Sequence, residues 1–140
     1  MRRITHLGGA RATLGLGFAL LAWDRRLGAG ALLANAGSHV VVQLLKRAVA
    51  RPRPCDASGA PLALVDLPDR HSFPSGHAAA ATAVAASVAI LHPLAAPLVL
   101  PAAALVAYSR VALRVHHVSD VLAGAALGLG GAIAAGYLLR

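Results

Sequence analysis

The sequence has one cysteine and few acidic residues, and each shortage excludes a class of protein. Cys55 is the single cysteine among 140 residues, so the chain forms no internal disulfide and no cysteine-based metal cluster. Acidic residues number 5 against 13 basic ones, and the formal net charge of +8 suits nucleic acid, anionic lipid or a phosphorylated substrate. Because the charges lie between apolar runs and form no continuous stripe, we expect no nucleic-acid partner.

Aromatic residues are also scarce, at 4%, whereas apolar residues are abundant. They make up 58% of the sequence, against roughly 45–50% in ordinary soluble domains. The excess is mostly Ala, Leu, Val and Gly in long runs, which suits helices packed in lipid. We therefore predict an all-α protein, a single domain over residues 1–140 built as an integral membrane bundle of about five helices. The five apolar segments are residues 12–23, 27–45, 77–91, 93–108 and 121–139.

Several of these segments are shorter than the roughly 20 residues that a spanning helix needs. Two alternatives therefore stay open for residues 12–23: a spanning helix, which we prefer, or a helix at the membrane interface. Residues 47–73 hold four prolines and most of the acids, which predicts an extramembrane loop. Small residues recur every four positions in the last segment, a spacing that lets helix backbones approach closely in lipid: Gly124, Gly128, Ala132 and Gly136.

Polar residues gather where the apolar segments begin or end. Because consecutive spanning helices alternate in direction, we expect all four polar clusters on the same side of the membrane. A shared site requires this arrangement, whereas scattered polar residues would lie on both sides. The four clusters are residues 46–54, 74–77, 109–110 and 116–120.

The clusters contain the side chains that bind a phosphoryl group. Lys46, Arg53 and Arg110 are fixed cations, and an arginine can bind two phosphoryl oxygens at once. The motif "PSGH" places Ser75 and the backbone N–H of Gly76 at a helix start, where anions bind. No histidine has zinc-ligand spacing and no Gly-rich nucleotide loop precedes the lysine, so we expect neither a metal nor a cofactor.

Histidines supply the remaining chemistry. A neutral imidazole can attack phosphorus when its other nitrogen gives its proton to an acceptor, and Asp120 is placed to be that acceptor. Helical i,i+4 spacing favours His116 as its partner, whereas i,i+3 spacing lets His117 compete. His77 could then protonate the leaving oxygen.

A further set of polar residues lies at i,i+4 spacing inside residues 27–45: Asn35, His39 and Gln43. Polar groups at membrane depth are costly and usually mark a function. We nevertheless predict that these three bond to neighbouring helices, because the phosphate site is complete without them.

Three sequence blocks carry a resemblance to a known family. "K-x6-RP" from Lys46 to Pro54, "PSGH" at 74–77 and "SR-x5-H-x3-D" at 109–120 resemble the signature blocks of the type 2 phosphatidic acid phosphatase family. That family shares its site with vanadium haloperoxidases and bacterial acid phosphatases. The resemblance implies their helical core, with this chain beginning where relatives have their second helix and lacking the usual first.

The resemblance also implies a role for each matching residue. His116 is the nucleophile that forms a phosphohistidine, Asp120 fixes its tautomer, and His77 protonates the leaving group and then activates water. The phosphate is held by Lys46, Arg53, Ser75, Gly76 and Arg110. Possible further substrate contacts are His71, Arg114 and His117.

We therefore expect a metal-independent phosphatase that hydrolyses a lipid phosphomonoester or diphosphate. The candidate substrates are phosphatidate, phosphatidylglycerophosphate, a prenyl diphosphate such as undecaprenyl diphosphate, and a prenyl-linked sugar phosphate. Two alternatives stay open, a phosphotransferase with an alcohol acceptor and a non-enzymatic membrane scaffold. Membrane lipids are expected partners, as is a second copy of the chain if it forms a homo-oligomer.

The expected location is the plasma membrane, crossed several times. Arginines beside the candidate site outnumber those at the opposite side, so the positive-inside rule would place the site in the cytoplasm. The resemblance implies an extracytoplasmic site instead. We prefer the extracytoplasmic side, because cations that bind phosphate distort the count.

Overall fold

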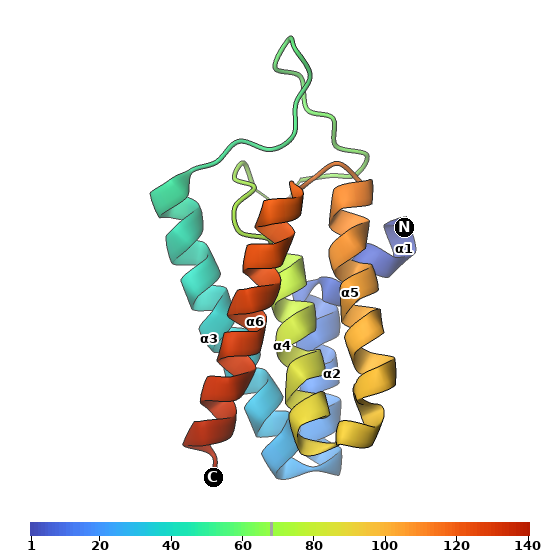
Figure 1. The fold of residues 1–140 in the computed structure, drawn as a ribbon, viewed down its shortest axis with the longest axis vertical. Coiled ribbons are helices and arrows are strands. Elements are labelled where there is room, and N and C mark those ends of the chain that lie inside the picture. The colour runs from blue at the N-terminus through green and yellow to red at the C-terminus, as the bar shows by residue number, and fades with distance from the viewer. Residues whose placement is uncertain (68) are drawn as a thin grey trace.

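The computed structural model describes residues 1–67 and 69–140 and is a bundle of helices (Figure 1). The predicted all-α class is confirmed, and the five long helices correspond to the five apolar segments. A short helix and a single 3-10 turn at the N-terminus were not predicted. The elements are α1 Arg2–Thr5, η1 His6–Gly8, α2 Ala10–Trp23, α3 Arg25–Val49, α4 Gly76–Leu91, η2 Pro93–Ala95, α5 Ala96–Ala112 and α6 Val118–Leu138.

The helix α4 lies at the centre of the bundle, where it contacts α2, α3, α5 and α6 (Figure 1). Its sequence suits this position because half of its residues are alanine, and nine of its residues are buried. Small side chains let four neighbouring helices approach one backbone closely. The first turn of this central helix belongs to "PSGH", so the packing holds that motif inside the bundle.

The predicted stripe of small residues on α6 packs directly against α4. An added Cβ on Gly124 would lie 2.3 Å from the carbonyl oxygen of Ser75, and one on Gly128 would lie 2.3 Å from that of Ala79. Ala132 is buried as predicted, but Gly136 has no neighbour within 4 Å of an added Cβ. A four-residue repeat drifts around a helix of about 3.6 residues per turn, so the stripe leaves the interface at its far end.

Helix capping extends α3 beyond its apolar run. The carboxylate of Asp24 accepts hydrogen bonds from the backbone N–H groups of Arg26 and Leu27, at 2.9 and 3.0 Å, and thereby starts the helix within a charged stretch. The helix ends at Val49, so Lys46 lies in its last turn. The non-helical connection to α4 accordingly begins at residue 50 and ends at residue 75, not at 47 and 73.

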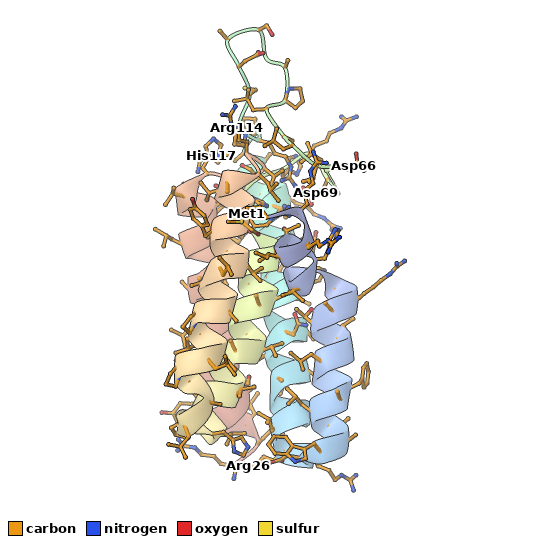
Figure 2. All side chains as sticks on the ribbon, turned by 90° about the vertical axis from the view of Figure 1, so that its right-hand side faces the viewer. Met1, Arg26, Asp66, Asp69, Arg114 and His117 are labelled. Carbon is orange, nitrogen blue, oxygen red and sulfur yellow. The ribbon has the colours of Figure 1, made fainter. Side chains whose placement is uncertain are left out.

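Three helices are long and apolar enough to cross a membrane: Arg25–Val49, Pro93–Ala112 and Val118–Leu138. The helices α2 and α4 have 14 and 16 residues and are shorter. At about 1.5 Å per residue, α4 is about 24 Å long against a hydrocarbon core of about 30 Å. Figure 2 shows α2 running lengthwise along the bundle, which favours the spanning alternative over an interfacial one.

The predicted polar clusters lie at one end of the bundle. The C-terminal ends of α3 and α5 and the N-terminal ends of α4 and α6 all point to the end that carries the long connection (Figure 1). Figure 2 shows Asp69, Arg114 and His117 at this end, whereas Arg26 lies at the opposite end. The one-sided arrangement predicted from alternating helices is therefore present.

Candidate active site

A cavity of about 420 Å³ lies at the polar end of the bundle, beside α2, α3 and α4. Its wall combines residues from all four predicted clusters, including the first turn of the central helix. Six of the predicted residues line it together: Lys46, Arg53, Gly76, His77, Arg110 and His116. The sequence blocks, which are as much as 70 residues apart, therefore meet around one space.

The long connection folds back on itself and so brings Arg53 to the cavity. The backbone of Pro52 pairs with that of His71, and the Ser72 hydroxyl donates to the Pro52 carbonyl at 2.8 Å. These bonds tie the two ends of the connection together next to α4. Segments that lie 16 residues or more apart therefore supply side chains to the same small region.

Lys46 and Arg53 are buried cations whose positions are fixed by several bonds. The Lys46 ammonium donates to the His71 carbonyl at 2.7 Å. The Arg53 guanidinium donates through Nη1 to the Val115 carbonyl at 2.7 Å and through Nε to the Asp69 carbonyl at 2.9 Å. Because few rotamers remain open to these side chains, their charges are preorganised for an anion.

Arg110 is held by the unpredicted N-terminal helix. This guanidinium is 3% exposed and donates through Nη1 to the Thr5 hydroxyl. Its Nε is buried and has no hydrogen-bond partner in the part of the chain that the structure describes. A second cavity, of about 660 Å³, adjoins the first at Arg110 and His77 and has Thr5 and His6 in its wall. The N-terminal segment therefore forms one side of the site.

A carboxylate that the sequence reasoning missed lies among the cations. Asp69 Oδ1 accepts from Arg53 Nη2 at 2.9 Å and faces Lys46 Nζ at 3.1 Å. Burial raises the pKa of this carboxyl, but the two cations outweigh burial and hold the pKa below 3.8. Asp69 is therefore ionised, and its oxygen occupies a position suited to a phosphoryl oxygen. The sequence signal for Asp69 is its proximity to "PSGH". This signal is weak, because the connection holds two other aspartates.

His116 lies between the cations and Asp120. Its Nε2 is 3.5 Å from Arg53 Nη1, and its Nδ1 is 3.7 Å from Asp120 Oδ2. Burial lowers the pKa of His116 below 6.5, and the Arg53, Arg110 and Lys46 cations lower it further. The imidazole is therefore neutral, with one nitrogen toward the cavity and the other toward a carboxylate.

Asp120 bonds to His117 more closely than to His116. The helix α6 begins at Val118, so both histidines precede it and the expected helical i,i+4 relation does not apply. The carboxylate accepts from the backbone N–H of His117 at 2.8 Å and faces the His117 Nδ1 at 3.1 Å, which forms a capping box. Its other oxygen accepts from Arg51 at 2.9 Å. The buried Nδ1 of His116 has no hydrogen-bond partner among the described residues.

Ser75 and Gly76 start α4 beneath the cavity. The Ser75 hydroxyl accepts from the Ala78 N–H at 3.4 Å, and the Ser75 N–H donates to the Asp120 carbonyl at 2.9 Å. Ser75 therefore acts as a helix cap and ties α4 to α6, while Gly76 lines the cavity. The neighbouring His77 packs against the N-terminal segment, because an added Cβ on Gly8 would lie 2.9 Å from its carbonyl oxygen.

The three possible substrate contacts lie around the cavity and not in its wall. His71 meets Lys46 through its backbone carbonyl. Arg114 is exposed, with a φ of 56°, and His117 is half-buried. Figure 2 shows Arg114 and His117 on the side of the bundle end away from Asp69.

Fold and cavity together define an integral membrane protein with a cavity lined by buried cations at one end of its helices. Residues 27–139 match the PAP2 superfamily, and the chain belongs to this family, as the signature blocks predicted. It is 44% identical over 102 residues to the decaprenylphosphoryl-5-phosphoribose phosphatase of Mycobacterium tuberculosis, covering 72% of this chain and 52% of that protein. It is 42% identical over 99 residues to the enzyme of the same name from Mycolicibacterium smegmatis, which covers 70% of this chain and 50% of that protein. The chain thus spans about half the length of the curated relatives it matches.

Two solved structures have the same fold. The phosphatidylglycerolphosphate phosphatase of Bacillus subtilis superposes with a TM-score of 0.81 at 30% identity, covering 99% of this chain and 74% of that one. LpxE of Aquifex aeolicus also gives a TM-score of 0.81, at 25% identity, covering 97% and 82%. The predicted membrane phosphatase fold is therefore confirmed.

Proposed function

We propose that the protein is a phosphatase that removes a terminal phosphoryl group from a membrane lipid, through a phosphohistidine and without a metal. The observation that carries this proposal is the cavity in which His116 Nε2 lies beside Arg53, with Lys46 and Arg110 in the same wall. Buried, immobilised cations in a water-poor site stabilise the charge of a phosphoryl-transfer transition state, which is the work a metal would otherwise do.

In the first step, neutral His116 attacks phosphorus through Nε2. An N–P bond forms, the P–O bond to the lipid breaks, and His77, which enters this step as an imidazolium, gives its proton to the departing oxygen and becomes neutral. Asp120 accepts the hydrogen bond from Nδ1–H and so stabilises the charge that develops on the ring. The separation of 3.7 Å must shorten for this bond, and catalytic hydrogen bonds often tighten only when the substrate binds.

In the second step, water attacks the phosphohistidine. The N–P bond breaks, His77 takes a proton from the water, and the product phosphate leaves. The Lys46, Arg53 and Arg110 cations hold the phosphoryl oxygens through both steps, together with the Gly76 N–H and the Ser75 hydroxyl.

The proposed substrate is a lipid that ends in a phosphomonoester or diphosphate. In support, the relatives are named for decaprenylphosphoryl-5-phosphoribose and phosphatidylglycerolphosphate, both lipid-linked phosphates. The panel to test holds phosphatidate, phosphatidylglycerophosphate, undecaprenyl diphosphate and a prenyl-linked sugar phosphate.

Phosphate release from this panel in detergent tests the proposal. We expect activity with at least one lipid, inhibition by vanadate, and loss of turnover in His116→Gln, with folding checked by thermal unfolding. Full activity in a folded His116→Gln protein would refute the assignment. Transfer of the phosphoryl group to an added alcohol, detected by product analysis, would identify a phosphotransferase. A folded protein that is inactive on the whole panel would indicate a scaffold.

We also propose that the site faces the extracytoplasmic side of the plasma membrane. Cys55 is exposed in the connection at the site end of the bundle, so it reports the side directly. In intact cells, a membrane-impermeant maleimide should label the parent protein but not the Cys55→Ser variant. Labelling that appears only after lysis would place the site in the cytoplasm.

A further inference from the structure

The site cavity continues beyond the cations along α3. Besides the phosphate-binding groups, its wall includes a row of polar side chains at membrane depth: Thr13, Asn35, His39 and Gln43. On an α-helix, residues four apart lie on one face, so Asn35, His39 and Gln43 form a continuous strip that leads away from Lys46. At about 1.5 Å per residue, Gln43 lies about 4.5 Å and His39 about 10 Å along the axis from Lys46.

Hydrogen bonds divide this strip into two parts. Asn35 Nδ2 donates to the Thr13 hydroxyl of α2 at 3.1 Å, which confirms the predicted interhelical bond for this residue. The prediction is wrong for the other two, because Gln43 Nε2 and His39 Nε2 contact each other at 3.3 Å on the same helix. That contact uses one nitrogen of each side chain. Within the described chain, the other imidazole nitrogen and the carboxamide oxygen have no side-chain hydrogen bond.

An imidazole and a carboxamide that face lipid tails without partners are unfavourable. Val40, Val41 and Leu44, which alternate with them on α3, are exposed and apolar, as lipid-facing residues should be. His39 and Gln43 depart from that pattern where the helix lines the cavity. The cavity volume of about 420 Å³ also falls in the range of pockets that hold a whole small ligand, which is more than a bare phosphate needs.

We infer that His39 and Gln43 form a subsite for a hydroxyl-bearing headgroup that lies between the terminal phosphate and the lipid chain. This inference rests on the proposed phosphatase function. The substrate class is then a lipid phosphodiester of a polyol or sugar that carries a second, terminal phosphate. Its hydroxyl groups donate to the carboxamide oxygen and bond to the imidazole. A phosphate attached directly to a diacylglycerol or prenyl chain offers these groups no hydroxyl donor, only ester oxygens or hydrocarbon.

Two phospholipids with the same acyl chains test this inference. Phosphatidylglycerophosphate has a glycerol between its terminal phosphate and its lipid phosphodiester, whereas phosphatidate has none. The variants are His39→Leu and Gln43→Leu, and the matched control is Val40→Leu, an exposed position at the same depth outside the cavity wall. Both kcat/KM and binding to the inactive His116→Gln background are measured for each lipid in nanodiscs.

We expect the parent to prefer phosphatidylglycerophosphate. Each variant should lower kcat/KM and affinity for this lipid about fivefold to tenfold, the loss expected from one unmade hydrogen bond. Values for phosphatidate should stay within about twofold, as should both lipids with Val40→Leu. Equal losses on both lipids, no loss on either, or a change in oligomeric state with unchanged lipid preference would overturn the subsite. If the parent releases no phosphate from any lipid, the proposed function fails, while the binding measurements still decide the subsite.

Discussion

Asp69→Asn tests whether the carboxylate among the cations competes with the phosphoryl group. Asp69 Oδ1 lies 2.9 Å from Arg53 Nη2 and 3.1 Å from Lys46 Nζ. A phosphoryl oxygen that binds the same two cations must displace this carboxylate or lie beside it. Asparagine keeps the shape and the acceptor oxygen but removes the charge. We therefore expect the variant to bind phosphate-like anions more tightly.

The structure limits the size of this effect. Two like charges about 4 Å apart repel by about 4 kcal/mol at an effective dielectric constant of about 20, which is an upper limit. The Asp69 side chain is 37% exposed, so water screens the charge and the carboxylate can rotate outward. Partly exposed ion pairs are worth about 1 kcal/mol or less. We expect KM for the lipid and the inhibition constant for vanadate to fall about fivefold, which corresponds to about 1 kcal/mol.

Initial rates of phosphate release in detergent, with and without vanadate, measure both constants. Asp66→Asn is the control, because it removes one exposed charge from the same connection (Figure 2), whereas the carboxylate paired with Lys46 and Arg53 among the described residues is Asp69. If Asp66→Asn lowers KM equally, the effect comes from the general field of the loop. A large fall in kcat with unchanged or higher KM would refute competition and show that Asp69 positions the two cations.

Three further predictions concern the histidines and helix packing. In His117→Ala the Asp120 side chain is free to bond to His116, so turnover should stay within about threefold of the parent value. Asp120→Asn should instead lower turnover about a hundredfold or more. Equal losses for the two variants in phosphate-release assays would contradict this assignment. Because burial and nearby cations lower its pKa, the His116 imidazole should stay neutral at about pH 5 in nitrogen-detected NMR, and a midpoint near 6.5 would exclude this. Gly128→Leu should unfold at a lower temperature in detergent, with a loss of about 1–3 kcal/mol or more, because its Cβ would meet an α4 carbonyl oxygen at 2.3 Å. Gly130→Leu should not lower the unfolding temperature, because an added Cβ on Gly130 meets no described atom within 4 Å.

The sequence predicts the long helices because apolar runs leave few alternatives in a membrane. It does not predict α1, whose four residues are too few for a periodic pattern and whose position depends on contact with α5. The helix ends also differ from the ends of the apolar segments, because a capping residue such as Asp24 acts through hydrogen bonds to the backbone, which hydropathy does not describe.

For the site, the sequence places Lys46, Arg53 and Arg110 together because each occupies a position fixed by a helix end or a motif. Asp69 and Thr5 join them through contacts across 16 and 105 residues of sequence, and the path of the connecting chain decides these contacts. Helical spacing cannot decide between His116 and His117, for a more local reason. Both lie one or two residues before α6 begins, so helical spacing cannot describe their distances to Asp120.

The stripe of small residues on α6 also determines where the proposed catalytic groups lie. At its upper end, Gly124 brings α6 so close to α4 that an added Cβ would lie 2.3 Å from the Ser75 carbonyl oxygen. The same approach lets the Ser75 N–H donate to the Asp120 carbonyl at 2.9 Å, which holds "PSGH" beside the segment that carries His116. Gly128 lies one turn further from the site, and an added Cβ there would meet the backbone of Ala79 and Ala83 and the side chain of Thr82. A larger residue at 124 must therefore separate the proposed phosphate-binding turn from the proposed nucleophile, whereas one at 128 disturbs packing first. One sequence pattern thus has two physical consequences along its length.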